Sequence, residues 1–157
     1  MDILDKDLLH LWKTLSNHNV RYIMVGGFAV NLHGYQRFTG DVDLWIEDTL
    51  NNRKNLRNAF IDLELGDNEA LETMTFIAGW TDFKFSDMTI DIMSNLKGLE
   101  NISFEECYQA SSKAEIEDIE VPFLHINHLI KAKKAADRPK DRLDIIELEK
   151  IRELRKR

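Results

Sequence analysis

The chain has 157 residues, 43% hydrophobic and 31% charged, a composition typical of one globular domain that buries its own core. It contains no long apolar run, so we expect no membrane span, and its acidic, amphipathic start is unlike a signal peptide. Cys107 is the only cysteine, which excludes an internal disulfide and a cysteine-based zinc site. We therefore expect a reducing, cytoplasmic setting.

The net charge of −7 is unevenly distributed along the chain. Residues 131–157 hold 11 Lys or Arg against 6 Asp or Glu, a net charge of +5, which leaves −12 for residues 1–130. An acidic body suits metal ions or solvent, whereas a basic end suits a polyphosphate or nucleic acid. A solvated helix face would give the same basic pattern, so both interpretations stay open.

The first part of the chain alternates helical and strand patterns. Apolar residues at helical spacing predict a helix over 7–18, and β-branched and aromatic residues predict a strand over 20–25. Two glycines, Gly26 and Gly27, end this strand and precede a short predicted helix over 28–35. A loop over 35–40 then leads into an alternating strand.

The remaining predicted elements give the fold class. Strands are expected at 41–47, 73–79, 81–86 and 88–94 and as a pair within 114–126, and helices at 49–64, 103–111, 126–136 and 139–155. This order predicts an α/β or α+β fold with a mixed central sheet flanked by helices. We expect a single domain over 1–157, with a core at about 20–125 and a C-terminal helical segment at about 126–157.

Aspartates occupy the polar face of two predicted strands. Asp41 and Asp43 alternate with apolar residues, so their side chains project from one face with Cα atoms roughly 6.5 Å apart. Asp91 lies in a second alternating strand between Ile90 and Ile92. If the strands are neighbours, the three carboxylates share a face. Aspartate is a poor strand former, and a divalent cation would turn the repulsion among three of them into ligation.

Gly26 and Gly27 fall between a strand and a helix. Glycine permits positive φ and close approach of the backbone to a ligand, and N–H groups at a helix start attract phosphate. The pattern is neither the dinucleotide-binding fingerprint nor a P-loop. For an isolated pair of glycines, a tight turn would be the better interpretation.

Together, "IMVGG", "FAVNLHG", "RFTGDVDLWI" and "TIDIM" resemble the nucleotidyltransferase superfamily in outline over residues 20–148. The segment "LIKAKKAADRPKDRLDIIEL" is similar to the closing segment of small AbiEii-like nucleotidyltransferases, and the layout is also similar to the lincosamide nucleotidyltransferases. The resemblance implies transfer of a nucleoside monophosphate from an NTP to an acceptor hydroxyl, with release of pyrophosphate.

The resemblance also implies roles for particular residues. Asp41 and Asp43 would ligate Mg²⁺ or Mn²⁺, and Asp91 would complete a second metal site or act as the base. Gly26 and Gly27 would hold the triphosphate through backbone donors alone, because Phe28 stands where a serine is often found.

Two cations are further candidates for the nucleotide site. Arg37 would contact a phosphate, or pair with Asp41 or Asp43 in the absence of metal; an ordinary loop cation is the alternative interpretation. Lys131 would bind the triphosphate opposite the glycines. The aspartates near Pro139, Asp141 and Asp144, are expected to fix the two C-terminal helices through ion pairs.

The partners expected from the sequence are an ATP-like or other NTP and an acceptor, which is a small molecule, a tRNA end or a protein hydroxyl as in a toxin–antitoxin pair. Because the chain is short, a second copy in a homodimer or a partner subunit would supply much of the acceptor site. The alternative is a catalytically inactive binding module, such as an antitoxin or a regulatory subunit. We expect Asp41→Asn to cost little stability, and Gly27→Ala to keep a near-normal melting temperature while losing nucleotide binding.

Overall fold

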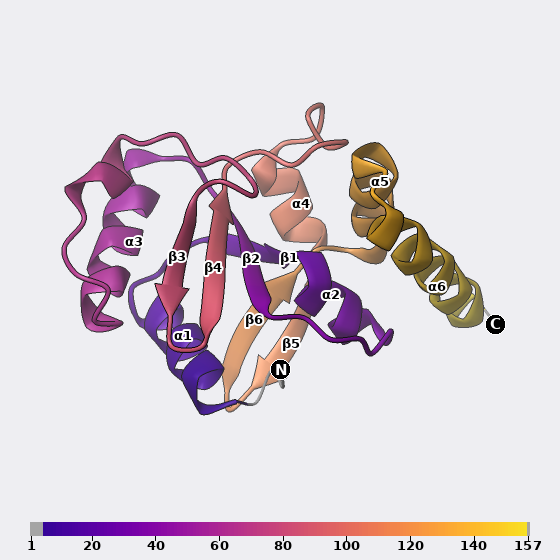
Figure 1. The fold of residues 1–157 in the computed structure, drawn as a ribbon, viewed down its shortest axis with the longest axis horizontal. Coiled ribbons are helices and arrows are strands. Elements are labelled where there is room, and N and C mark those ends of the chain that lie inside the picture. The colour runs from indigo at the N-terminus through magenta and orange to yellow at the C-terminus, as the bar shows by residue number, and fades with distance from the viewer. Residues whose placement is uncertain (1–4, 157) are drawn as a thin grey trace.

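The computed structural model describes residues 5–156 and forms a mixed sheet flanked by helices (Figure 1). The helices are α1 (Lys6–Asn17), α2 (Gly26–His33), α3 (Leu50–Asp62), α4 (Phe104–Ala110), α5 (Ile126–Ala136) and α6 (Pro139–Arg155), with a 3-10 helix η1 (Glu69–Glu72). The strands are β1 (Tyr22–Val25), β2 (Asp41–Ile46), β3 (Asp82–Phe85), β4 (Met88–Met93), β5 (Ser112–Ile116) and β6 (Ile119–Phe123). The predicted fold class is confirmed.

The sheet has six strands in the order β3-β4-β2-β1-β6-β5. β1 pairs antiparallel with β2, whereas β2 pairs parallel with β4 and β1 pairs parallel with β6. The outer strands β3 and β5 join the sheet as antiparallel hairpins with β4 and β6. The two carboxylate-bearing strands, β2 and β4, are therefore immediate neighbours.

Alternation of side chains along β2 divides the sheet into two faces. Val42, Leu44 and Ile46 are buried on one face. Helices α1 and α3 cover this face, because Trp12 stacks on Tyr22, whose register partner is Ile46, and Phe60 packs edge-on against Phe83 of β3.

The other face of β2 carries Asp41, Asp43 and Trp45. Trp45 is buried, packs edge-on against Phe104 of α4, and donates its indole N–H to the Ser94 carbonyl over 3.1 Å. Trp45 therefore closes this face at one end, and the aspartates remain at the other end.

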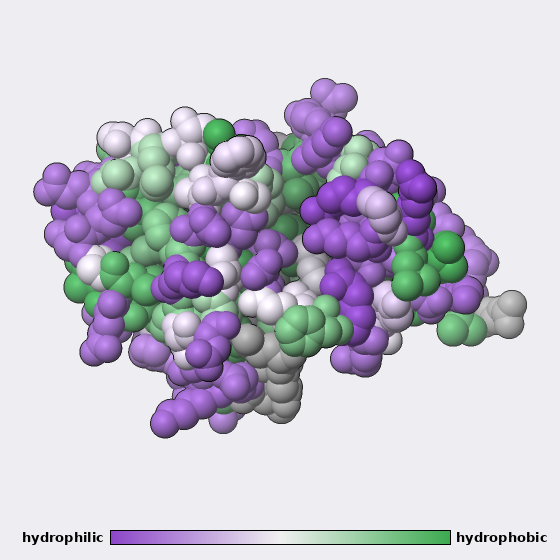
Figure 2. All heavy atoms as spheres, viewed as in Figure 1, coloured by the Kyte–Doolittle hydropathy of each residue, from purple (hydrophilic) through white to green (hydrophobic). Residues whose placement is uncertain are grey.

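Helices α5 and α6 follow the sheet and extend away from it toward the C-terminus (Figure 1). Pro139 occupies the first turn of α6, where its missing N–H costs nothing, as predicted. Hydrophilic side chains cover most of the visible surface around these helices, interrupted by an apolar patch over α6 (Figure 2). The exposed apolar side chains of α6 are Leu143, Ile146 and Leu154. Within residues 5–156, no helix combines the length and apolarity needed to cross a membrane.

The strand predicted at 73–79 is wrong, because this segment has no strand pairing. Arg53 of α3 contacts this segment instead, because its Nη1 donates to the Met74 carbonyl over 2.7 Å, as well as to the carbonyl of Leu71 in η1 over 3.1 Å. The guanidinium also lies over the Phe76 ring, with Cζ 4.4 Å from the centroid. Phe76 is thus buried without strand pairing, whereas its neighbour Ile77 is 51% exposed.

Candidate active site

The three predicted aspartates lie on one face of the neighbouring strands β2 and β4. In the parallel register Asp43 is opposite Asp91, and Asp41 is opposite Thr89. Alternation then places all three carboxylates on the same side of the sheet, as the sequence predicts. They line a cavity of about 440 Å³ together with Gly26 and Gly27.

Mutual repulsion and burial shape the electrostatics of the carboxylates. Burial, followed by the charges of Asp91 and Asp41, raises the pKa of Asp43 to about 6, although Lys140 and Lys133 act in the opposite direction. Burial also raises the pKa of Asp91. Ionisation of this cluster at neutral pH is therefore costly unless a cation is bound.

The side chain of Asp91 is only partly satisfied by the protein. Its Oδ2 accepts a 2.8 Å hydrogen bond from the Gly79 N–H, whereas its Oδ1 is buried without a hydrogen-bond partner in the described part of the chain. A buried carboxylate oxygen with no partner is unusual. Asp82 of β3 faces Asp91 across the antiparallel register and adds a fourth carboxylate, which the sequence pattern did not single out.

The distances among these carboxylates are longer than a shared metal ion would require. Among residues 5–156, no group of three Asp, Glu, His or Cys side chains is close enough together to hold a metal ion. The donor set nevertheless fits a hard divalent cation, because an acidic pair of neighbouring strands offers Asp43 and a buried, unpaired oxygen of Asp91. Asp41 is exposed at the same strand end.

The two glycines begin α2 directly beside the carboxylates. Gly26 has φ of +68°, a conformation that favours glycine, and a Cβ atom there would overlap Oδ2 of Asp43. The glycine thus lets the start of α2 touch the acidic cluster. Both glycines line the cavity, so the N–H groups of the first turn lie beside it.

Gly27 is packed more tightly than the sequence suggested. A Cβ at this position would lie 2.6 Å from Oγ1 and 2.8 Å from Cβ of Thr39, and 3.2 Å from Nη1 of Arg37. The space beside Gly27 is therefore filled by the loop before β2. The expectation that Gly27→Ala leaves the fold undisturbed is wrong for this reason, since the added methyl group meets protein atoms.

Arg37 lines the cavity but does not pair with the active-site carboxylates. Its Nε and Nη2 donate to Oδ1 and Oδ2 of Asp144, at 2.8 and 2.9 Å. The partner is therefore an aspartate of α6, not Asp41 or Asp43. The structure thus supports the structural role expected of Asp144.

Lys131 is exposed and is not among the residues that line the cavity. The cavity wall contributed by α5 and α6 carries Lys133, Arg138 and Lys140 instead. Lys133 is buried on the same helical face as Leu129 and Ile130. The sequence signal for Lys133 was its position within the apolar stripe of α5. Lys131, in contrast, falls on the solvent side of the same helix.

The fold recurs in several solved structures. A lincosamide antibiotic adenylyltransferase with lincomycin bound matches with a TM-score of 0.60 and 18% identity, over 94% of this chain and 97% of that chain. The enzyme ANT(2″)-Ia in complex with adenylyl-2″-tobramycin matches with a TM-score of 0.55 and 18% identity, over 94% and 92%. A nucleotidyltransferase candidate from Thermotoga maritima matches with a TM-score of 0.53 and 16% identity, over 95% and 88%.

At these identities the likeness to solved structures concerns the fold. A search of curated protein sequences found no significant match. The sequence model of a family described as "Nucleotidyl transferase of unknown function" matches residues 4–157, essentially the whole chain. The chain therefore belongs to this family and is a nucleotidyltransferase.

Proposed function

We propose that the protein transfers a nucleoside monophosphate from an NTP to an acceptor hydroxyl, with Mg²⁺ or Mn²⁺ as the cofactor and pyrophosphate as the second product. The observation that carries the proposal is the cavity that is lined together by three carboxylates of β2 and β4, by the start of α2 and by basic residues of α5 and α6. Phosphoryl transfer needs mainly positioning and charge neutralisation, and this cavity offers groups for both.

The carboxylates supply the metal-binding side of the proposed site. Asp41 and Asp43 would hold the ion, and Asp91 would bind a second ion or accept the proton of the acceptor hydroxyl. When bound, the divalent ions neutralise phosphate charge and polarise the attacked phosphorus. The raised pKa of Asp43 and the unpaired Oδ1 of Asp91 support this assignment, because a cation would relieve both.

The opposite walls suit a triphosphate. The first turn of α2 offers backbone N–H donors beside Gly26 and Gly27. Lys133, Arg138 and Lys140 add positive charge along α5 and α6. A triphosphate lying between these walls would place its α-phosphate toward the carboxylates.

The acceptor hydroxyl would belong to a small molecule, a tRNA end or a protein. The matched structures include enzymes whose names or ligands concern lincosamide antibiotics and tobramycin, which are small hydroxylated molecules. Phe38 and Trp80 are 82% and 83% exposed, and each directly follows a cavity-lining residue, Arg37 or Gly79. Both rings are therefore available to stack on a nucleobase or on an acceptor.

The test uses an NTP labelled at the α-phosphate, Mg²⁺, and three separated acceptor pools: small metabolites, tRNA and proteins. The wild-type protein should release pyrophosphate and label one pool, and Asp43→Asn should abolish the labelling. Asp87→Asn is the matched control, because Asp87 is exposed in the turn between β3 and β4 and lies outside the cavity.

A direct binding measurement accompanies the transfer assay. Titration calorimetry should detect Mg²⁺-dependent binding of a non-hydrolysable NTP to wild type and not to Asp43→Asn. Nucleotide binding without any labelled pool would favour the non-catalytic binding module. Absence of both nucleotide binding and labelling would contradict the proposed function.

A further inference from the structure

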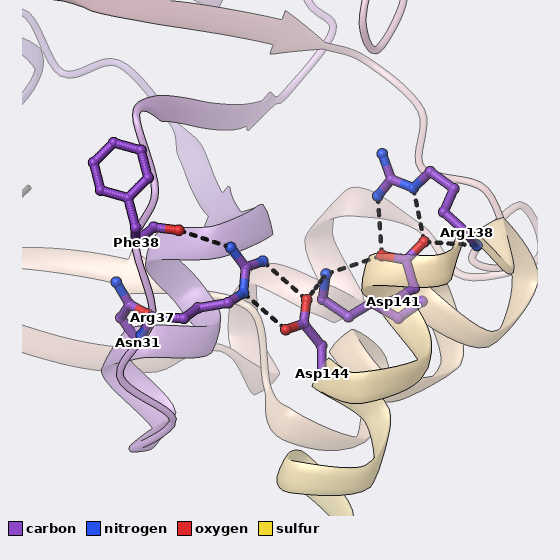
Figure 3. Close-up of polar contacts among 7 residues, drawn as sticks. Asn31, Arg37, Phe38, Arg138, Asp141 and Asp144 are labelled. Carbon is purple, nitrogen blue, oxygen red and sulfur yellow. Dashed lines mark hydrogen bonds and ion pairs between the residues drawn. The ribbon is translucent and has the colours of Figure 1, made fainter.

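A buried charge network joins the loop before β2 to helices α5 and α6 (Figure 3). Asp144 has a side chain only 1% exposed and binds Arg37 through two hydrogen bonds. Its Oδ2 also lies 2.9 Å from Nζ of Lys133. Asp144 is therefore a carboxylate shared by Arg37 and Lys133, two of the cations that line the cavity.

Asp141 plays a different part in the same network. Arg138 donates to it from Nε at 2.7 Å, from Nη2 at 3.1 Å and from its backbone N–H at 3.1 Å. Asp141 also lies 3.2 Å from Nζ of Lys133. Most of its hydrogen-bonding capacity is used to fix the first turn of α6, whereas Asp144 reaches across to the loop that contains Arg37.

The orientation of Arg37 follows from its contact with Asp144. With Nε and Nη2 taken by Asp144, the remaining Nη1 donates to the Phe38 carbonyl at 3.1 Å and lies beside Gly27. The backbone N–H of Arg37 is held by Asn31 of α2 over 3.1 Å. The guanidinium is thus fixed at the start of α2, where the proposed triphosphate would lie.

Lys133 is fixed in the same way from the other side. Its side chain is 6% exposed, and a buried ammonium needs oxygen partners at all its donors. Asp141 and Asp144 supply two of them, and the third donor is left to the cavity that Lys133 lines. An anion in that cavity would complete the coordination of the ammonium.

We propose that Asp144 is a positioning residue for the triphosphate, which it would not touch: it orients Arg37 and Lys133 from two separate segments toward one anion site. This inference rests on the proposed function, since it assumes that the polyphosphate of an NTP is the anion. It adds a specific role for α6, which becomes part of the nucleotide site through a carboxylate buried behind the two cations.

The direction in which Asp144→Asn changes the affinity for a polyanion separates a positioning role from simple electrostatics. Asp144→Asn removes a negative charge close to the anion site, so Coulomb attraction alone would strengthen the binding of a polyanion. If orientation matters more, the same substitution weakens binding, because Arg37 and Lys133 lose the group that aims them. We expect a weakening of about tenfold or more, the size of one misplaced charge-assisted hydrogen bond.

The experiment measures binding of inorganic tripolyphosphate in the presence of Mg²⁺ to wild type and Asp144→Asn by calorimetry. Arg37→Lys keeps the charge but cannot form the two-point contact, so it should weaken binding similarly. The double variant should bind about as weakly as the weaker single variant, because both substitutions disrupt one unit. Binding of Mn²⁺ alone should be unchanged in both single variants.

Arg155→Gln is the control for a purely structural effect. Arg155 holds the far end of α6 by donating to the His33 carbonyl over 3.1 Å, and it lies outside the cavity. Loosening α6 there should leave tripolyphosphate affinity unchanged. An equal loss in Arg155→Gln would overturn the positioning role, as would unchanged or tighter binding in Asp144→Asn. If Asp144→Asn does not fold, Asp144→Glu is measured instead: it keeps the negative charge but displaces the carboxylate, so weaker tripolyphosphate binding supports the positioning role and unchanged binding overturns it.

The two proposals fail in distinguishable ways. A wild-type protein that does not bind Mg²⁺-tripolyphosphate contradicts the proposed function and this inference together. A wild-type protein that binds it, with the Arg37→Lys and Asp144→Asn variants binding equally well, contradicts only the role of Asp144.

Discussion

Glycine is required at the two positions that begin α2 for different physical reasons. Gly26 needs its positive φ and leaves room for the Asp43 carboxylate, whereas Gly27 leaves room for Thr39 and Arg37. Neither requirement can be read from a glycine pair in a sequence. Both arise because the loop before β2 and the first residues of β2 pack against the start of α2.

Gly27→Ala should therefore destabilise the protein without any ligand. The added methyl group has to displace Thr39, a buried residue, and overpacking of this kind costs about 1–3 kcal/mol. Urea denaturation of the variant measures the loss, and Gly27→Ala combined with Thr39→Ala should recover part of it. An unchanged unfolding midpoint for Gly27→Ala would show that the loop moves aside without cost.

The ionised side chain of Asp43 should destabilise the folded protein more than that of Asp41. Asp41 is exposed, whereas Asp43 is mostly buried between Asp41 and Asp91 and has a pKa raised to about 6. At pH 7.5 without divalent ions, Asp43→Asn removes this charge and should stabilise the fold by on the order of 2 kcal/mol. Thermal melts with and without Mg²⁺ check this, because Mg²⁺ should stabilise wild type but not the variant. A variant less stable than wild type in metal-free buffer would instead make Asp43 a structural residue.

At the scale of elements, α2 is anchored at its C-terminal end by a buried histidine. Nε2–H of His33 donates to the Leu124 carbonyl over 2.7 Å, and Nδ1 accepts from Nη2 of Arg155 over 3.2 Å. Only the neutral ring can make both contacts. One side chain thus links α2, the end of β6 and α6.

This anchor predicts a pH dependence of stability. Burial, together with the Arg155 charge, lowers the pKa of His33 below its usual 6.5, although the Leu124 bond opposes this. The unfolded chain therefore takes up a proton first. The contribution of His33 is complete above about pH 6.5 and falls as the pH drops toward the folded-state pKa.

The corresponding variant is His33→Gln, whose amide can still donate to Leu124. It should cost about 1–2 kcal/mol at pH 7.5, because the ring contact with Phe123 is lost, and the gap from wild type should narrow by pH 5.5. Chemical denaturation at several pH values measures both curves. Parallel curves across this range would show that His33 does not titrate as described.

Element periodicity also explains why Lys133 lines the cavity and Lys131 does not. Lys131 and Lys133 are two residues apart on α5, so their side chains point in different directions around the helix. The apolar stripe that contains Leu129 and Ile130 marks the inward side, and Lys133 belongs to it. A lysine inside such a stripe is buried only where carboxylates receive it, and α6 provides them.

At the scale of the whole molecule, the uneven charge of the sequence has a spatial meaning. The acidic residues of β2 and β4 and basic residues of α5 and α6 line the same cavity. A cation and a polyphosphate together would neutralise both sets of residues. Part of the segment 131–157, with its net charge of +5, therefore lines the cavity, and part of it is a solvated helix surface, which Figure 2 shows.

The sequence by itself determined the features that depend on local periodicity. Alternation in β2 and β4 placed Asp41, Asp43 and Asp91 on one strand face, and Pro139 marked the start of α6, because strand and helix periods are properties of neighbouring residues. The segment at 73–79 shows the limit of this reasoning. Its composition suits a strand, but its carbonyls bond to other groups: that of Met74 accepts from Arg53, and that of Thr75 accepts from the Thr81 hydroxyl.

Only the tertiary structure decided which distant groups meet. Arg37 pairs with Asp144 across 107 residues of sequence, Gly27 meets Thr39, and the Asp91 carboxylate turns to the Gly79 N–H. Each of these contacts depends on where two segments come together in space, and residue type offers several equivalent partners. Burial then selects among them, because a buried charge or polar group is stable only beside the partner that the packing supplies.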